Sequence, residues 1–176
     1  MISDWKKEIE LAWAVLRDME KVDIHRLWQY RPPRCPATED SLSEAEAIVG
    51  HALDARYREF LRTANGWEFF FHDVTLFGTL ELSGGELMTA ADTMLNEIFP
   101  ACYNECPLDK SEILPIAVSA RDRDFFVITR PSAPCGSGIV IWLSGGEIER
   151  FATFDDFFLA MINYNRDEIE DFHAGQ

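Results

Sequence analysis

Residues 53–67, LDARYREFLRTANGW, constrain the fold of this chain more than any other segment. Apolar residues recur there at offsets of zero, four, seven, eight and eleven, so they share one face of a helix. The apolar face consists of Leu53, Tyr57, Phe60, Leu61 and Ala64, and the opposite, charged face of Arg56, Arg58, Glu59 and Arg62. Asp54 can cap the start, and Asn65-Gly66 favours the left-handed conformation that ends a helix. Trp67 then follows at a fixed point beyond the turn.

The N-terminal third of the chain contains two more segments with the apolar period of a helix. Residues 3–20 have Ser3 as the expected cap and carry an apolar stripe of Trp5, Ile9, Ala12, Leu16 and Met19. Capping boxes of the form S-x-x-E start at Ser41 and Ser43. They predict a helix that packs beside the one at 54–64.

Helical patterns return later in the chain, over residues 86–99 and from Thr153 onward. The last helix is expected to bury Phe154, Phe157, Phe158, Met161 and Ile162. Asp155 and Asp156 fall in its first turn, where negative charge stabilises the positive end of the helix dipole by roughly 0.3–1 kcal/mol. We therefore interpret this acidic pair as structural and not as catalytic or metal-binding.

Aromatic and β-branched residues gather in segments that predict strands. These segments are 67–71, 74–82, 113–118, 125–129, 139–143 and 147–151. Pro115 has no N–H to donate to a sheet ladder, so it should lie at an edge or at the start of a strand. Glu147 and Glu149 alternate with Ile148, which places the two carboxylates on the solvent face. The order of elements predicts an α+β fold, with an antiparallel-rich mixed sheet packed by helices at both chain ends.

A proline-rich segment separates the first helix from the rest of the chain. Residues 30–40, YRPPRCPATED, contain three prolines and cannot continue a helix. We expect residues 1–37 to form an N-terminal helical extension with this linker, and residues 38–176 to form the α+β domain as one globular unit. Trp5 and Trp13 indicate that the extension docks onto the body of the protein.

Four motifs follow one another in a specific order along the chain. A helix pair ends in Y-x-x-F-L-x-x-x-N-G-W, and an LPIA strand, a V-x-W strand and an F-x-x-F-D-D-F segment come after it. The most specific positions are Tyr57, Phe60, Leu61, Asn65, Gly66, Leu114, Pro115, Ile116 and the segment 154–158. Over roughly residues 38–164, this order resembles the SUKH superfamily, which includes the fungal Smi/Knr cell-wall regulators and many bacterial immunity proteins. The resemblance implies a SUKH-like fold that binds another protein and performs no chemistry.

The chain is strongly acidic. Asp and Glu outnumber Lys and Arg by 31 to 16, which gives a formal net charge of −15. Such a charge repels nucleic acid and anionic membranes and speeds the encounter with a basic partner, so we expect no nucleic-acid or membrane partner. The acidity could equally serve solubility alone, because net charge bears on association and not on fold.

The sequence contains no targeting or membrane signal. The start, MISDWKKEIELAW, lacks the basic segment and apolar run of a secretory signal, and no stretch approaches the ~20 apolar residues that span a bilayer. We therefore expect a cytoplasmic protein. Its cysteines, Cys35, Cys102, Cys106 and Cys135, should stay reduced in that compartment.

Candidate chemistry is weak throughout. LSGGE at 82–86 and 143–147 is close to the signature of ABC ATPases, but the chain has no phosphate-binding G-x-x-x-x-G-K-[ST] loop. The glycines more simply indicate tight turns, such as a hairpin at 144–146. Cys102 and Cys106 could contribute to a zinc site, yet a second close pair is missing. We expect no catalytic residue, no cofactor and no metal, so an enzyme with an unrecognised site is the least favoured alternative.

Arg121, Asp122, Arg123 and Asp124 lie between two predicted strands and should form an exposed charged turn. The superfamily often has glycines at this turn, so the charges are a departure and our choice for partner-binding residues. The resemblance implies an immunity protein that neutralises a bacterial toxin, such as a nuclease, and the acidity favours a basic toxin domain. The alternative is a regulatory or signalling scaffold of the Smi/Knr type.

Overall fold

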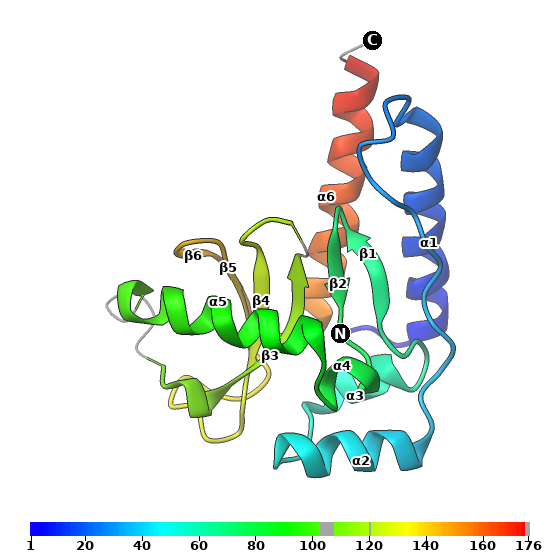
Figure 1. Ribbon diagram of the computed structural model, residues 1–176. Coiled ribbons are helices and arrows are strands. Elements are labelled where there is room, and N and C mark those ends of the chain that lie inside the picture. The colour runs from blue at the N-terminus through cyan, green and yellow to red at the C-terminus, as the bar shows by residue number, and fades with distance from the viewer. Residues whose placement is uncertain (103–107, 120, 175–176) are drawn as a thin grey trace.

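The computed structural model of the chain describes residues 1–102, 108–119 and 121–174. The helices in these ranges are α1 (Trp5–Val22), α2 (Glu39–Val49), α3 (Ala55–Leu61), α4 (Thr79–Leu82), α5 (Glu86–Cys102) and α6 (Phe154–Ala174), with a short 3-10 turn at Lys110–Glu112. The strands are β1 (Trp67–Phe71), β2 (Val74–Leu76), β3 (Ile113–Ser119), β4 (Phe125–Thr129), β5 (Val140–Leu143) and β6 (Glu147–Phe151). The predicted α+β class, with helices at both chain ends, is confirmed (Figure 1).

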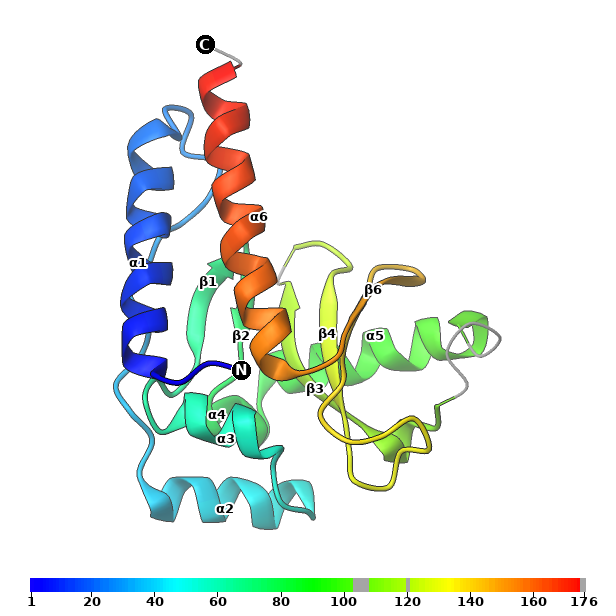
Figure 2. The same ribbon diagram turned by 180° about the vertical axis from the view of Figure 1, so that it is seen from behind.

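The strands form one six-stranded sheet in the order β1-β2-β3-β4-β5-β6, and each neighbouring pair is antiparallel. Helix α5, inserted between β2 and β3, lies across one face of the sheet (Figure 1). Helix α6 covers the other face, and α1 stands beside it (Figure 2). The short helices α3 and α4 gather with α2 at the end of the molecule from which α6 starts.

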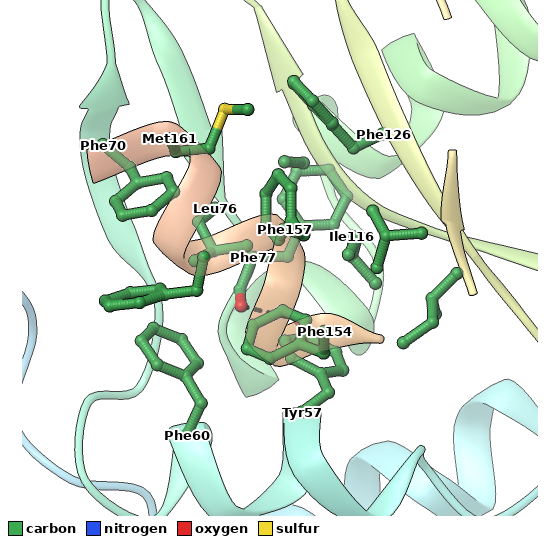
Figure 3. Packing of buried hydrophobic residues seen from close by; sticks show 14 of the residues in the cluster. Tyr57, Phe60, Phe70, Leu76, Phe77, Ile116, Phe126, Phe154, Phe157 and Met161 are labelled. Atoms are coloured by element: carbon green, nitrogen blue, oxygen red, sulfur yellow. Dashed lines mark hydrogen bonds between the residues drawn. The ribbon is translucent and has the colours of Figure 1, made fainter. Parts of the chain in front are cut away.

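Aromatic side chains between α3, α6 and the sheet form the centre of the core (Figure 3). The ring centroid of Phe154 lies 5.0 Å from that of Tyr57, and Phe157 lies 5.1 Å from Phe126. Such ring pairs contribute about 0.5–1.5 kcal/mol each beyond the area that they bury. The apolar residues predicted to be buried by the last helix are all buried, namely Phe154, Phe157, Phe158, Met161 and Ile162.

The buried hydroxyl group of Tyr57 donates a hydrogen bond of 2.7 Å to the carbonyl oxygen of Phe77. The Tyr57→Phe substitution keeps the ring but removes this donor from a buried carbonyl group. We expect the free energy of unfolding to fall by about 1–2 kcal/mol, as measured by urea denaturation. Equal stability of the two proteins would mean that the carbonyl group does not depend on this hydroxyl.

Helix boundaries differ from the predicted ones at several points. Asp4, and not Ser3, caps α1, because its carboxylate accepts a hydrogen bond of 3.2 Å from the N–H of Lys7. Thr38 caps α2, so this helix starts before the predicted serines. Helix α6 continues to Ala174, well beyond the predicted end of the apolar stripe. Its additional turns form one wall of the groove described below.

The predicted strand over 74–82 is wrong in its second half. Only its first three residues form a strand, β2, although the N–H of Phe77 still donates to the carbonyl oxygen of Ile116 at 2.7 Å; its end forms the short helix α4. The Glu81 carboxylate accepts a hydrogen bond of 2.8 Å from the N–H of Gly78. The side-chain oxygen of Asn65 accepts one of 2.7 Å from the N–H of Thr79. Side chains therefore bind the backbone donors that a longer strand would direct to the ladder.

Pro115 lies within β3, which runs between β2 and β4 and is an interior strand, contrary to the expected edge. Strand β2 pairs only with residues 117–119 of β3 and ends before it reaches Pro115. The register toward β4 also shifts between Pro115 and Ala117. Bulges are one of the few places where a sheet tolerates proline, so the irregularity explains its position.

The hairpin predicted at 144–146 is confirmed, and the Ser144 N–H donates to the Gly146 carbonyl group at 2.9 Å. The predicted faces of β6 are wrong, because Ile148 is 55% exposed whereas Glu147 and Glu149 are partly buried. A register shift on β5 and a hydrogen bond of 2.5 Å from Tyr164 to the carboxylate of Glu149 account for the difference.

The N-terminal helix joins the central core. The ring of Trp5 lies 5.6 Å from that of Phe60 and 5.2 Å from that of Phe158, measured between centroids. The linker is bound to α3, since the N–H of Ala37 donates to the carbonyl oxygen of Leu61 at 2.9 Å. These contacts agree with the expected docking of the extension. The division of the chain at residue 37 stays a prediction.

Candidate binding surface

A groove of about 830 Å³ lies along the C-terminal half of α6. Its other walls are the end of α1 with the residues that follow it, the turn between β1 and β2, and one side chain from β5. These segments meet where the tip of the β1–β2 hairpin approaches α6 (Figure 1). The groove therefore exists only because α6 extends past the core.

Three aromatic rings form the floor of the groove: Phe71 from β1, Trp142 from β5 and Tyr164 from α6. The ring centroid of Trp142 lies 5.7 Å from that of Phe71 and 6.1 Å from that of Tyr164. Phe71 and Tyr164 are 6.2 Å apart. Phe71 is nearly buried, whereas the other two rings are partly exposed. The floor thus offers aromatic surface to a ligand.

A stack of rings holds His72, which lines the groove, in place. The imidazole ring of His72 lies between Trp28 and Phe71, at centroid distances of 4.3 and 4.1 Å. The indole N–H of Trp28 donates to the carboxylate of Glu168 at 3.0 Å, and Nε2 of His72 contacts the same carboxylate. Burial raises the pKa of Glu168, but the hydrogen bond and charge of His72 and the bond from Trp28 outweigh it, so the net pKa is lowered. Glu168 is thus held ionised by structural partners.

Asp23 anchors the loop that leaves α1. It is 2% exposed and accepts hydrogen bonds from the backbone N–H groups of Leu27 and Trp28 and from the hydroxyl group of Tyr30. Burial raises the pKa of Asp23, but the hydrogen bonds and the charge of Arg26 together lower it by a larger amount. The net pKa of Asp23 therefore lies below its ordinary value. The ionised carboxylate therefore fixes the loop that places Trp28 against His72, a residue of the groove lining.

Acid should destabilise the protein through these two carboxyl groups. Both pKa values lie below the ordinary values of 3.8 for Asp23 and 4.5 for Glu168. The stabilisation is therefore complete above those values and is lost as the pH falls through the folded-state pKa values. We expect the free energy of unfolding, measured in urea, to fall between about pH 5 and about pH 3, and less steeply in the Asp23→Asn variant. An equal slope for that variant would contradict a role for Asp23.

The rim of the groove is acidic. Asp167 and Asp171 lie one helical turn apart on α6, line the groove and are exposed. Among the described residues, neither forms an ion pair with a basic side chain. The basic groups in the lining are His25 and His72, and no Lys or Arg of the described ranges contributes to it.

The predicted charged turn is linked to this groove at one end only, through Asp124. Arg121, Asp122 and Arg123 are exposed, as expected, and Asp124 is partly buried. The Asp124 carboxylate accepts a hydrogen bond of 3.0 Å from the indole N–H of Trp142, whose ring belongs to the floor. The structure thus brings one end of the turn to the groove, while the role of these residues in binding stays a prediction.

Comparison with known protein families shows to which family the chain belongs. The family model described as SMI1-KNR4 cell-wall, SUKH_6, matches residues 39–158, more than half of the chain. The chain belongs to the SMI1-KNR4 family. This confirms the resemblance inferred from the sequence motifs. No curated protein matches the chain.

The SMI1-KNR4 match covers only part of the groove. Phe71, His72 and Trp142 lie within the matched residues 39–158, whereas Tyr164 and the acidic rim lie beyond them. The end of α1 lies outside the match as well. The family domain therefore supplies most of the floor of the groove, whereas the end of α1 and the C-terminal half of α6 supply its walls.

This groove was not predicted from the sequence, where Trp142 appears only as part of the V-x-W strand motif. The overlooked signal was the continuation of the helical period beyond residue 162, where Tyr164, Glu168 and Phe172 repeat at intervals of four. The approach of the loop at Trp28 to His72 depends on hydrogen bonds between distant segments, which no local pattern indicates.

The described residues contain no group of three or more His, Cys, Asp or Glu side chains that could hold a metal ion. Cys106 and the side chain of Cys102, the pair considered for zinc, lie outside the described part of the chain. Within that part, no helix combines the length and the apolar character required to cross a membrane.

Proposed function

We propose that this SMI1-KNR4 family member is a non-catalytic protein-binding domain that acts as an immunity protein in the cytoplasm and neutralises a basic toxin domain. The observation that carries the proposal is the groove on α6, in which an aromatic floor meets an acidic rim. Aromatic side chains provide most of the affinity at protein interfaces, and complementary charge provides steering and specificity. The groove combines both on one surface.

The charge of the whole protein supports a basic partner. Its formal net charge is −15, and a field of this kind accelerates association with a positively charged protein and repels acidic ones. A nuclease that grips phosphate groups is basic around its cleft. An acidic protein that covers this cleft can therefore exclude nucleic acid by competing for the same positive charges.

The surroundings of the ionisable groups support a role in binding. Glu168 and His72 contact each other, and Glu168 also accepts a hydrogen bond from Trp28. Asp23 is surrounded by donors from its own loop. These groups are occupied in holding the walls of the groove, and nothing in their arrangement resembles a nucleophile poised beside a base.

Co-expression with a toxin tests the proposal. The probe is a basic toxin domain, chosen from any that the neighbouring genes encode, and it is produced in a sensitive bacterial host with and without the protein. We expect growth to be restored only when the two are produced together. Continued toxicity at matched protein levels would contradict an immunity role for this pair.

A regulatory scaffold is the second candidate. The description of the matching family model names the cell wall, which fits a protein that regulates cell-wall processes. A scaffold should bind several housekeeping proteins and leave toxin activity unchanged. Purified candidate partners, each titrated singly against the protein, distinguish the two functions, because an immunity protein should bind only one toxin tightly.

A further inference from the structure

We propose that the groove on α6 receives an arginine side chain from an exposed, partly apolar segment of the partner protein. The inference rests on the proposed function, because it names the contact by which a basic partner would be held. Three features of the groove carry it: the aromatic floor, the exposed carboxylates of the rim and an exposed apolar residue at the mouth.

The floor suits a flat cation. Trp142 and Tyr164 are partly exposed and stand at 64° to each other, with centroids 6.1 Å apart. The faces of such rings are electronegative and attract a cation within about 6 Å of the centroid. A guanidinium group is planar and weakly hydrated, so it stacks on these rings better than the ammonium group of lysine does.

The rim supplies the countercharge. Asp167 and Asp171 follow each other by one turn on the wall of α6, and among the described residues neither has a basic partner. The five N–H donors of arginine can reach two carboxylates at once. A neutral apolar ligand would instead remove water from both carboxylates without replacing their hydrogen bonds, which costs free energy.

The mouth of the groove indicates what flanks the arginine. Ile24, just beyond the end of α1, is 66% exposed and belongs to the lining. Phe172 on α6 is partly exposed on the same groove. Apolar neighbours of the arginine would cover these side chains, so the preferred segment is an arginine between apolar residues and not a run of basic ones.

A peptide titration tests the inference. The probe is a blocked peptide with one arginine between two leucines, and its comparison peptide carries citrulline, which has the same shape without the charge. The indole N–H resonance of Trp142, followed by NMR on the isotope-labelled full chain, reports on the floor. We expect saturable shifts at millimolar arginine peptide, and affinity for the citrulline peptide weaker by about tenfold.

Two charge variants locate the site. Asp167→Asn with Asp171→Asn should weaken binding of the arginine peptide by about fivefold or more, because the countercharge is gone. Glu10→Gln with Glu170→Gln removes the same total charge from exposed positions outside the lining and should leave the affinity unchanged. Both double variants should have the melting temperature of the parent.

Several results would overturn the inference. They are equal affinity for the two peptides, no shift at Trp142, equal losses in both double variants, or self-association that occupies the groove in sedimentation experiments. The co-expression test separates this failure from failure of the proposed function. Restored growth together with an unresponsive groove would keep the immunity role and reject the arginine site, whereas peptide binding without restored growth would do the reverse.

Discussion

Replacing Arg56 by Met is expected to lower the free energy of unfolding by about 3 kcal/mol, because it strands a buried charge. Nε of Arg56 donates to the carboxylate of Asp155 at 2.9 Å, and the Asp155 side chain is only 2% exposed. Breaking a buried pair from one side typically costs about 3–5 kcal/mol. The lower end applies because the N–H of Ile2 still donates to this carboxylate, at 2.6 Å.

The Arg62→Met substitution is the matched control for Arg56→Met. Arg62 pairs with Glu39, but the two side chains are 47% and 61% exposed, so water and salt screen this pair and it should contribute little to stability. Urea denaturation at neutral pH measures both variants. Similar losses for Arg56→Met and Arg62→Met would show that the contact with Asp155 does not hold the N-terminus, α3 and α6 together.

Replacing Gly66 by Ala is expected to destabilise the protein by about 3–4 kcal/mol. Gly66 has a φ of +86°, which L residues with a side chain adopt at a cost, and a Cβ atom there would lie 2.5 Å from the backbone nitrogen of Gly78 and 2.9 Å from the carbonyl oxygen of Leu76. Both neighbours are backbone atoms and cannot move aside without disturbing the end of β2.

Gly50→Ala separates backbone strain from the steric clash. Gly50 has a similar φ of +80°, yet a Cβ atom there would meet nothing within 4 Å. We expect it to cost about 1 kcal/mol, because only the left-handed conformation opposes the side chain. Thermal unfolding of both variants gives the comparison. Equal effects would mean that the approach of Gly78 to Gly66 is looser than the structure indicates.

The elements that were predicted well depend on neighbours in sequence. The apolar face of α3 and its cap at Asp54 follow from spacing alone, and the structure has both. The alternation of turn residues and β-rich segments also located most of the strands. Local sequence patterns were therefore sufficient to predict the fold class, and the order of the motifs was sufficient to predict the family.

The features that escaped prediction join distant segments. Arg56 was placed on a charged outer face, but it reaches Asp155, which is 99 residues away in sequence. Helix α4 replaces a predicted strand because Asn65 and Glu81 bind backbone donors across a turn. The groove forms only where the end of α1 and the C-terminal half of α6 meet at the β1–β2 turn. Its aromatic residues are of the same types as those in the core, so their identity alone does not reveal a binding surface.

Binding of a basic toxin domain is measured by titrating the purified full chain with the purified toxin domain whose toxicity the protein suppresses on co-expression. Calorimetry at low and then high salt measures affinity, stoichiometry and salt dependence together. We expect a one-to-one complex of submicromolar dissociation constant that weakens as salt is added, since complementary charge is screened. The absence of any complex at micromolar concentrations in low salt would contradict the account.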